Sequence, residues 1–546
     1  MMQCFPHSQS QGLQLWETSA NYAPGMYLTG ILSLAGTLLF ASSRVVSSHR
    51  ILAFLPFNGK THHIIYRPIL EALADAGHNI TYVTPISPSE KHPKINYILI
   101  DDCYPGFNSK FFFENSKRTF YYLQVNAVYG ITTAGLEKVY NQPNVKNLIE
   151  SSETFDAVIT ETCFFQEANA ALHHRFNAVG IEICCLGERS WINSVAGLPD
   201  NTAYMIDYRS PYTDNMNLLE RIHNAYITLS ISLSSLFYLH RMEQVAKRSL
   251  KYHGSEDRPP LDHILANISM ILVNSHPALS YPYPTSPHVK KIAGVVINKK
   301  TKPLPEHLQN FLDNAEHGVI YMSLGTNLAI VSESTEFGDV ASTFMKVFGN
   351  LKQRVVMKWD SDYPKDQVPA NVIMSSWFPQ QQILAHNRTK LFISHGGYSS
   401  LYESAYYGVP IIGIPYFGDQ PKNILAAVVA GYCVRVNYDN VSEDSLTWAI
   451  KELLNNKRYK AEAERRSALL RDTRTSPVDD AVFWIEHSIK FPNALTPRSA
   501  YMSFVVLNLI DVKFILLIII FSMYYVARRF IISNNLKVPT NKVKSS

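Results

Sequence analysis

The chain has 546 residues, of which 46% are hydrophobic and 17% are charged, and its formal net charge is +5. This length suggests two or three domains with large cores, and the composition argues against a disordered chain. The small net charge and the lack of a Lys/Arg stripe with interleaved aromatic residues argue against nucleic-acid binding. Six cysteines are too few and too irregularly spaced for a disulfide framework. Cys163, Cys184 and Cys185 lie in apolar runs, which predicts buried thiols.

The N-terminal segment predicts a targeting signal. Residues 27–41 are apolar and end in small residues before Arg44, as the h-region and cleavage site of a secretory signal do. The residues that precede this run contain no Lys or Arg. Met26 could therefore be the true start, and the run could also be an uncleaved anchor or a buried strand or helix. We assign residues 1–49 to an N-terminal extension and signal peptide.

A first α/β region follows the targeting segment. Residues 50–57 form a short apolar run bounded by Pro and Asn-Gly, which predicts a buried parallel strand. Apolar residues at helical spacing predict a helix over 63–76 that ends at Gly77. The next strand is predicted over residues 80–84. Strand, helix and strand in this order form a βαβ unit.

The βαβ pattern recurs twice along the chain. Strands are predicted at 155–160 and 180–186 around a helix at 168–176, whereas the aromatic-rich region 104–147 shows no regular pattern. Residues 299–305 have the composition of a linker. A second series of short apolar runs then alternates with helical segments, which predicts a second doubly wound parallel sheet. We place the two domains at 50–298 and 299–500. The predicted strands of the second domain are 319–323, 355–359, 372–375, 391–394 and 411–414.

The C-terminal region predicts one membrane-spanning helix. Residues 514–527 are almost wholly apolar, and the apolar run 502–510 before them brings the stretch close to the roughly 20 residues that a bilayer requires. A buried core helix is the alternative. Basic residues without acidic ones follow from Arg528, which predicts a cytosolic tail and a luminal body. We assign 501–529 to the membrane-proximal segment and helix and 530–546 to the tail.

Two features of this region predict the endoplasmic reticulum as the location. Lys542 and Lys544 resemble a dilysine retrieval signal, although basic residues that flank a membrane helix would give the same pattern. The glycosylation sequons at Asn267, Asn387 and Asn440 would be luminal in this topology.

Residues 377–423 carry the most specific pattern of the chain. WFPQQQILAH is followed by FISHGGYSSLYESAYYGVPIIGIPYFGDQPKN. This ordered set resembles the nucleotide-sugar signature of the UDP-glycosyltransferase (UDP-glucuronosyltransferase) superfamily. Its individual residues are most similar to those of invertebrate members. The resemblance implies the GT-B architecture, an α/β fold with two Rossmann-like domains facing a cleft. In that family a last helix crosses back onto the first domain, and residues 481–486 resemble it.

The donor site is predicted around His395-Gly396-Gly397. This segment follows a predicted strand and opens a helix, where glycines let the backbone approach a diphosphate and the helix N-terminus favours its charge. The resemblance implies that His395 and Ser400 contact the diphosphate and that Trp377 stacks on the uracil. It further implies ribose contacts from Gln380 and Glu403, sugar contacts from Asp419 and Gln420, and a diphosphate contact from the Ser323, Gly325 and Thr326 loop. Ser399 departs from the family, in which Asn or His is frequent.

The acceptor side is predicted in Gly59-Lys60-Thr61-His62-His63. The family places its general base in this turn, and alignment of Pro68 and Gly77-His78 selects His62, with His63 as the second candidate. A histidine can accept a hydroxyl proton near neutral pH. The family pairs this base with an Asp that follows the strand 155–160, where this chain has Glu161. Glutamate is one methylene longer, so the pairing requires an adjusted geometry.

Other chemistries find less support in the sequence. Asp360-Ser361-Asp362 has the form of a metal-binding DxD but lies in a polar loop, and no Cys/His spacing predicts zinc. The resemblance implies that no metal ion is needed, because helix ends and hydrogen-bond donors stabilise the leaving diphosphate. We expect no cofactor, because the UDP-sugar is a co-substrate. An oxidoreductase is excluded because no GxGxxG follows a strand with an acidic residue further along.

The sequence therefore predicts an inverting UDP-glycosyltransferase with His62 and Glu161 as its catalytic residues. The donor is UDP-glucose or UDP-glucuronate, with a mild preference for glucose, and the acceptor is a small lipophilic hydroxyl compound. The enzyme would be a single-pass membrane protein of the endoplasmic reticulum, and a homo-oligomer is compatible with the sequence. The alternative is a catalytically silent relative that binds UDP-sugars or lipophilic molecules.

Overall fold

The computed structural model of the chain describes seven stretches. The description below concerns the unit that begins at His49. The predicted targeting segment, Thr326, the Asp360–Asp362 loop and Lys542 and Lys544 lie outside the described residues. The described stretches are 47–104, 109–117, 121–187, 189–297, 303–325, 340–359 and 363–535.

The first sheet has seven strands, and every neighbouring pair is parallel. Its order is β3-β2-β1-β4-β5-β6-β7. The order reverses between β1 and β4, so the crevice for ligands is expected beyond the carboxyl ends of these two strands. The strands are β1 (Arg50–Phe54), β2 (Asn79–Thr84), β3 (Ile95–Leu99), β4 (Ala157–Thr160), β5 (Val179–Cys184), β6 (Met270–Val273) and β7 (Val289–Lys291).

The second sheet has six parallel strands in the order β10-β9-β8-β11-β12-β13. Here the order reverses between β8 and β11, which places a second ligand crevice beyond the ends of those strands. Two doubly wound sheets confirm the predicted fold class. The strands are β8 (Val319–Ser323), β9 (Arg354–Lys358), β10 (Val372–Ser375), β11 (Thr389–Ser394), β12 (Ile411–Gly413) and β13 (Cys433–Arg435).

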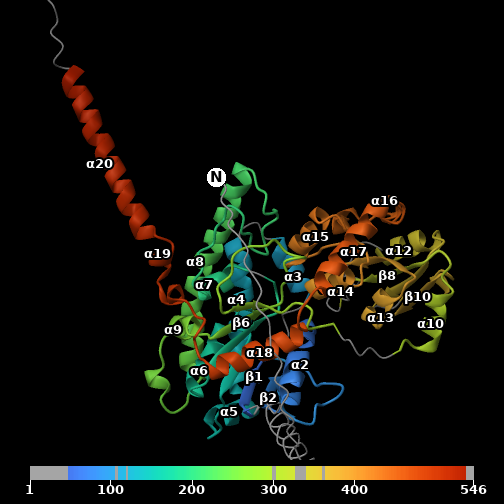
Figure 1. Ribbon diagram of the computed structural model, residues 1–546, viewed down its shortest axis with the longest axis horizontal. Coiled ribbons are helices and arrows are strands. Elements are labelled where there is room, and N and C mark those ends of the chain that lie inside the picture. Colours follow the sequence, from blue (N-terminus) through green and yellow to red (C-terminus); the bar gives the residue numbers. More distant parts are fainter. Residues whose placement is uncertain are drawn as a thin grey trace, which may run out of the picture. The chain divides into compact units, whose positions relative to one another are not determined.

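Helices connect the strands of both sheets (Figure 1). In the first sheet region they are α2 (Lys60–Asp75), α3 (Ser109–Ser116), α4 (Tyr121–Asn141), α5 (Pro143–Glu150), α6 (Ala171–Arg175), α7 (Ser190–Val195), α8 (Leu218–Ser249) and α9 (Leu261–Ala266). After them come α10 (Glu306–Asp313), α12 (Val340–Gly349), α13 (Gln380–Ala385), α14 (Tyr398–Tyr406), α15 (Gln420–Val429), α16 (Glu443–Asn455), α17 (Lys457–Arg471), α18 (Pro477–Lys490), α19 (Phe504–Leu507) and α20 (Ile510–Asn535).

Several predicted helices differ from those in the structure. Region 104–147, which the sequence left irregular, contains α3, α4 and the start of α5. The helix expected from His63 begins three residues earlier, at Lys60, so His62 lies in its first turn rather than in a preceding loop. The helix expected over 168–176 is a 3-10 turn at Glu167–Ala170 followed by α6.

Helix α18 returns the chain from the second sheet to the first. Ser476 caps its N-terminus by accepting a hydrogen bond from the backbone N–H of Asp479. Ala481 and Ile485 of α18 are fully buried in the core that contains Ile69 of α2. In Figure 1 α18 accordingly lies beside α2.

Helix α20 is long and apolar enough to cross a membrane over Ile510–Ser533. Its large apolar side chains, such as Phe514 and Phe521, are exposed. An apolar helix without protein packing would be unfavourable in water, and it suits a lipid environment.

Candidate active site

One cavity of about 1100 Å³ is lined by residues from both sheets. The two sheet regions are also joined by direct contacts: the Tyr398 hydroxyl accepts a hydrogen bond from the backbone N–H of His276, and Lys422 Nζ donates to the carbonyl of Ile206. The cavity brings together most of the predicted site. Its walls include His62, Ser323, Gly325, Trp377, Gln380, His395, Gly397, Ser400, Glu403, Asp419 and Gln420.

His62 and Glu161 form a close pair at the switch point of the first sheet. His62 lies in the first turn of α2 after β1, and Glu161 directly follows β4. The His62 Nδ1–H donates to the Glu161 carboxylate at 2.8 and 3.0 Å. The longer side chain of glutamate therefore reaches the histidine, and Nδ1 is engaged so that Nε2 can accept a proton.

Glu161 is held by donors from three sides. Besides His62, the Tyr66 hydroxyl donates to it, and the Cys185 backbone N–H donates to Oε1 at 3.2 Å. Burial raises the pKa of this carboxyl, but the charge of His62 and the three donors outweigh burial, so the pKa lies below its usual value. Glu161 is therefore an anion at neutral pH and can stabilise a protonated His62.

His63 is placed differently from His62. Its Nε2–H donates to the carbonyl of Phe57 at 2.6 Å, and Nδ1 accepts from the hydroxyls of Tyr82 and Thr84. Burial lowers the pKa of His63 to about 4. Both ring nitrogens are thus engaged within the protein, which suits a structural role and leaves His62 as the histidine that faces the cavity.

His62, Glu161 and Cys185 are also the described residues whose ligand atoms could together hold a metal ion. Burial raises the pKa of the Cys185 thiol well above its usual value, which disfavours the thiolate that a metal needs. Cys163, Cys184 and Cys185 are all buried free thiols, as the apolar runs predicted. The group of His62, Glu161 and Cys185 suits hydrogen bonding better than metal coordination. The expectation that the enzyme needs no metal ion stays a prediction.

His395 lies beyond β11 between two glycines. A Cβ at Gly325 would lie 2.8 Å from His395 Cε1, and one at Gly397 would lie 2.5 Å from Nε2. Burial, together with the charge of Lys358, lowers the pKa of His395 to about 4, so the imidazole is neutral. Its Nδ1 has no hydrogen-bond partner among the described residues. The ring lines the cavity, and a neutral imidazole has one N–H with which to donate to a phosphate oxygen.

Replacing Gly397 with alanine is expected to raise the KM for the UDP-sugar about tenfold or more, because the new methyl group displaces His395. The matched control is Gly130→Ala in α4, where an added Cβ meets nothing within 4 Å. Initial rates over a range of UDP-sugar concentrations check this prediction. An unchanged KM in Gly397→Ala with an altered KM in the control would contradict it.

The predicted ribose contacts lie in one hydrogen-bonded group. Gln380 Nε2 donates to Glu403 at 2.5 Å and to Ser400 Oγ at 3.2 Å. Gln381 Nε2 donates to the other Glu403 oxygen at 2.9 Å. Burial raises the pKa of Glu403, while the two glutamine amides oppose the shift. Trp377 precedes this group and is 68% exposed, which leaves a ring face for stacking.

Asp419 and Gln420 lie at the start of α15. Asp419 accepts from Asn423 Nδ2 at 2.7 Å, and burial raises its pKa, with Lys422 and His62 among the charges that oppose the shift. Asp419 and the predicted base His62 line the same cavity. Gln420 uses its carbonyl oxygen to hold the backbone N–H groups of Tyr416 and Phe417.

Of the predicted donor residues that the structure describes, Gly396 is the one that does not line the cavity. Thr326 lies outside the described residues. Gly396 is described, but its φ of +85° and the 2.4 Å distance from an added Cβ to Ile424 Cγ1 indicate that glycine is needed here for backbone conformation and packing against α15.

The sequence did not identify three residues of the site. Lys358 lines the cavity and donates to the Gly325 carbonyl at 2.8 Å. It ends β9, and the carboxyl ends of parallel strands are where ligands bind, so its position was a usable signal. Gln381 adjoins Gln380 in the motif, and Tyr66 lies one helical turn after His62 on the same face of α2.

The fold and the sequence both match known proteins. The family model for UDP-glucuronosyl and UDP-glucosyl transferases matches residues 58–544. The glycosyltransferase of kitacinnamycin has a TM-score of 0.55 at 16% identity, covering 81% of this chain and 100% of its own. A UDP-glucosyltransferase of Polygonum tinctorium has a TM-score of 0.52 at 16% identity, and the match covers 82% of this chain and 100% of that protein. These structures confirm the GT-B architecture.

Curated relatives extend over nearly the whole chain. UDP-glucosyltransferase 2 of Dactylopius coccus is 31% identical, over 89% of this chain and 93% of that protein. The rat 2-hydroxyacylsphingosine 1-beta-galactosyltransferase is 28% identical, over 93% of this chain and 92% of that protein. Human UDP-glucuronosyltransferase 3A2 is 28% identical, over 85% of this chain and 88% of that protein. The chain therefore belongs to the UDP-glucuronosyl and UDP-glucosyl transferase family and is a UDP-glycosyltransferase.

Proposed function

We propose that this enzyme transfers glucose from UDP-glucose to the hydroxyl group of a small apolar acceptor, with inversion at the anomeric carbon. One observation carries the proposal: a single cavity is lined by His62 of the His62–Glu161 pair and by the nucleotide-sugar residues beyond β11. A base and a donor site that share one cavity can bring an acceptor hydroxyl and an anomeric carbon together.

The proton transfer uses the free nitrogen of His62. Because Nδ1–H donates to Glu161, Nε2 accepts the proton of the acceptor hydroxyl. The acceptor oxygen forms a bond to the anomeric carbon as the bond from that carbon to the UDP oxygen breaks. The proton ends on His62, beside the Glu161 carboxylate, and the electron pair of the broken bond leaves on UDP.

The leaving diphosphate is stabilised by groups of the second sheet. The N-terminus of α14 begins after Gly397 and has no side-chain cap, so its backbone N–H groups can face a phosphate. Neutral His395 lines the cavity beside this terminus, and Lys358 adds a positive charge beside it. Fixed donors of this kind stabilise developing negative charge without rearrangement.

The sugar subsite supports glucose as the donor sugar. The Asp419 carboxyl group can accept hydrogen bonds from sugar hydroxyls, whereas its negative charge would repel a sugar carboxylate. The insect relative with 31% identity is named a UDP-glucosyltransferase. UDP-glucuronate is the alternative donor.

The acceptor half of the cavity supports an apolar substrate. Phe57, Phe112, Phe164 and Phe165 contribute to its wall, and Leu186 adds an aliphatic surface. Pockets with apolar walls and a few polar groups bind molecules that are mostly apolar.

The proposed location is the endoplasmic reticulum membrane with the catalytic body in the lumen. Helix α20 supports an anchor, and the basic residues that follow it support a cytosolic tail. The dilysine-like pair Lys542 and Lys544 supports retrieval to this compartment.

UDP release tests the proposal. Membranes that contain the full chain are expected to release UDP from UDP-glucose only when a phenol or a lipophilic alcohol is present, and to do so at least about tenfold faster than from UDP-glucuronate. Membranes without the protein are the control. Faster release from UDP-glucuronate would overturn the donor assignment, and UDP-sugar binding without release for any acceptor would favour a silent binder.

A further inference from the structure

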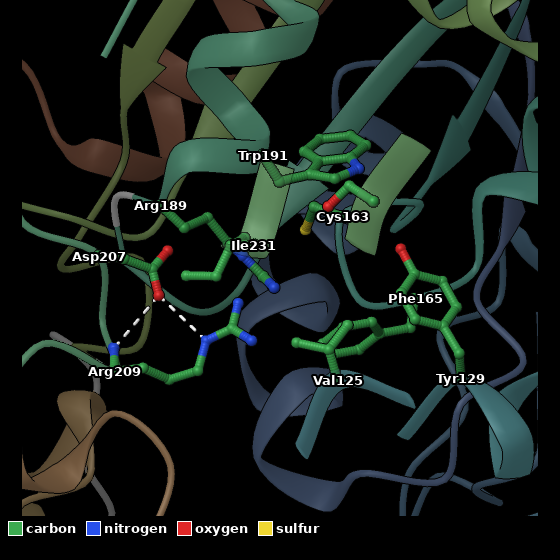
Figure 2. A pocket seen from close by; sticks show the side chains of 10 residues that line it. Val125, Tyr129, Cys163, Phe165, Arg189, Trp191, Asp207, Arg209 and Ile231 are labelled. Carbon is green, nitrogen blue, oxygen red and sulfur yellow. Dashed lines mark hydrogen bonds and ion pairs between the residues drawn. The ribbon is translucent and has the colours of Figure 1, made fainter. Parts of the chain in front are cut away.

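A second, much smaller cavity of about 10 Å³ opens beside the acceptor half of the main cavity. Val125, Phe165 and Arg209 line both cavities, so the two are neighbours. A volume of this size holds about one water-sized oxygen atom. Figure 2 shows the guanidinium groups of Arg189 and Arg209 pointing into the same small space.

Arg189 is the unusual member of this cavity. It is only 4% exposed, yet its Nε and Nη1 have no hydrogen-bond partner among the described residues. Its guanidinium lies over the rings of Phe165 and Tyr208, with Cζ 5.3 and 5.1 Å from the ring centroids. Buried donors in proteins are nearly always paired, so two free nitrogens on one buried cation indicate a missing acceptor.

The buried carboxyl groups near Arg189 compensate its charge only in part. Asp207 is buried, but it already accepts from the Arg209 backbone N–H and from Arg209 Nε at 3.1 Å. Lys422 is a further cation that interacts with Asp207. Glu167 also interacts with Arg189, but burial raises the pKa of its carboxyl to about 7. Asp207 is thus shared by three cations, and an incompletely compensated buried charge is costly.

Aromatic contacts connect Arg189 to the proposed base. The His62 ring contacts Phe164 at a centroid distance of 4.8 Å, Phe164 contacts Phe165 at 5.7 Å, and Phe165 lies under Arg189. An apolar acceptor that lies along Phe164 and Phe165 has one end at His62 and the other at Arg189.

We propose that Arg189 binds a carboxylate oxygen at the end of the acceptor remote from its reacting hydroxyl. This inference rests on the proposed function and narrows its acceptor to an aromatic or aliphatic hydroxy acid. One carboxylate oxygen occupies the small cavity and accepts from Arg189 Nε and Nη1, and the apolar body covers the two phenylalanines. A guanidinium suits this partner because it offers several donors in a fixed plane.

Matched acceptors test the proposal with the full chain in detergent or membranes. The probes are 4-hydroxyphenylalkanoates of increasing chain length and 4-alkylphenols of equal length. Wild type is expected to prefer the carboxylate at one chain length. Arg189→Met is expected to lower kcat/KM for that acid by roughly 10- to 100-fold, as for the loss of a charged hydrogen bond, and to change the alkylphenol value by less than about threefold. Arg189→Lys is expected to restore part of the preference.

The control variant is Arg175→Met. Arg175 donates to the carbonyls of Ile149 and Ser151, and it lies outside both cavities. This control is expected to lower stability without altering the ratio of acid to alkylphenol. Equal losses for both acceptor classes in Arg189→Met would overturn the proposal in favour of a structural arginine. No preference in wild type would overturn it in favour of a resident water.

Ligand binding separates this inference from the proposed function. If wild type releases no UDP with any acceptor, the proposed transferase reaction fails. Equilibrium binding of the same acid and alkylphenol to wild type and Arg189→Met, measured with UDP present, then still decides the carboxylate site. Tighter binding of the acid to wild type alone supports it, and equal binding to both proteins overturns it.

Discussion

Replacing His62 with alanine is expected to lower kcat by about 10²- to 10⁴-fold and to leave the affinity for UDP-glucose within about twofold. The reason is positional: His62 is the one of the two adjacent histidines that lines the cavity, and its Nδ1 is engaged by Glu161. The variant loses the acceptor of the hydroxyl proton but no donor-site contact. Single-turnover rates and equilibrium binding of UDP-glucose measure the two effects separately.

His63→Ala is the matched control for this prediction. Because His63 bonds to Phe57, Tyr82 and Thr84, its loss is expected to lower the free energy of unfolding by about 1–3 kcal/mol. The folded fraction is expected to turn over at close to the wild-type rate. Normal turnover in His62→Ala with a large loss of kcat in folded His63→Ala would show that the base is misassigned.

Most of the two sheets could be predicted because their central strands are buried on both faces. Such strands read as short, continuous apolar runs, and the predicted run 319–323 coincides with β8. Other strands were missed, among them β3 (INYIL) and β7 (VKK), in which polar residues interrupt the apolar run.

The long helix α8 was missed for a different physical reason. Its serines and threonines interrupt the apolar periodicity, and apolar side chains lie on both its buried and exposed faces, for example Ile231 and Leu233. Its start carried a usable signal, since Asn217 and Glu220 form a reciprocal capping box.

Most of the predicted donor residues lie within one short stretch of chain, 377–420, where a sequence pattern can be recognised, whereas the acceptor side is assembled from distant segments. His62 and Tyr66 belong to α2, Glu161 follows β4, and Cys185 follows β5. The sequence could propose the pair of His62 and Glu161, but it could not reveal the donors from Tyr66 and Cys185. Those donors depend on the register of β1, β4 and β5, which only the folded chain fixes.

Glu161→Gln is expected to lower kcat by about 10²-fold, because an amide cannot stabilise a protonated His62 as a carboxylate does. Glu161→Asp is expected to lower kcat about tenfold, although aspartate is the residue expected in relatives. Shortening by about one bond length, ~1.5 Å, withdraws the carboxylate from contacts that now measure 2.8 Å to His62 and 3.2 Å to Cys185. Rates of UDP release from folded protein measure both effects.

Stability against pH gives a second measurement for Glu161. Its pKa is lower in the folded protein, so its ionisation stabilises the fold above the ordinary glutamate pKa, and this contribution is lost as the pH falls through the lowered value. The stability difference between wild type and Glu161→Gln is therefore expected to be constant near neutral pH and to shrink on acidification. A difference that grows on acidification, or an Asp variant faster than wild type, would mean that the carboxylate does not hold His62 in this geometry.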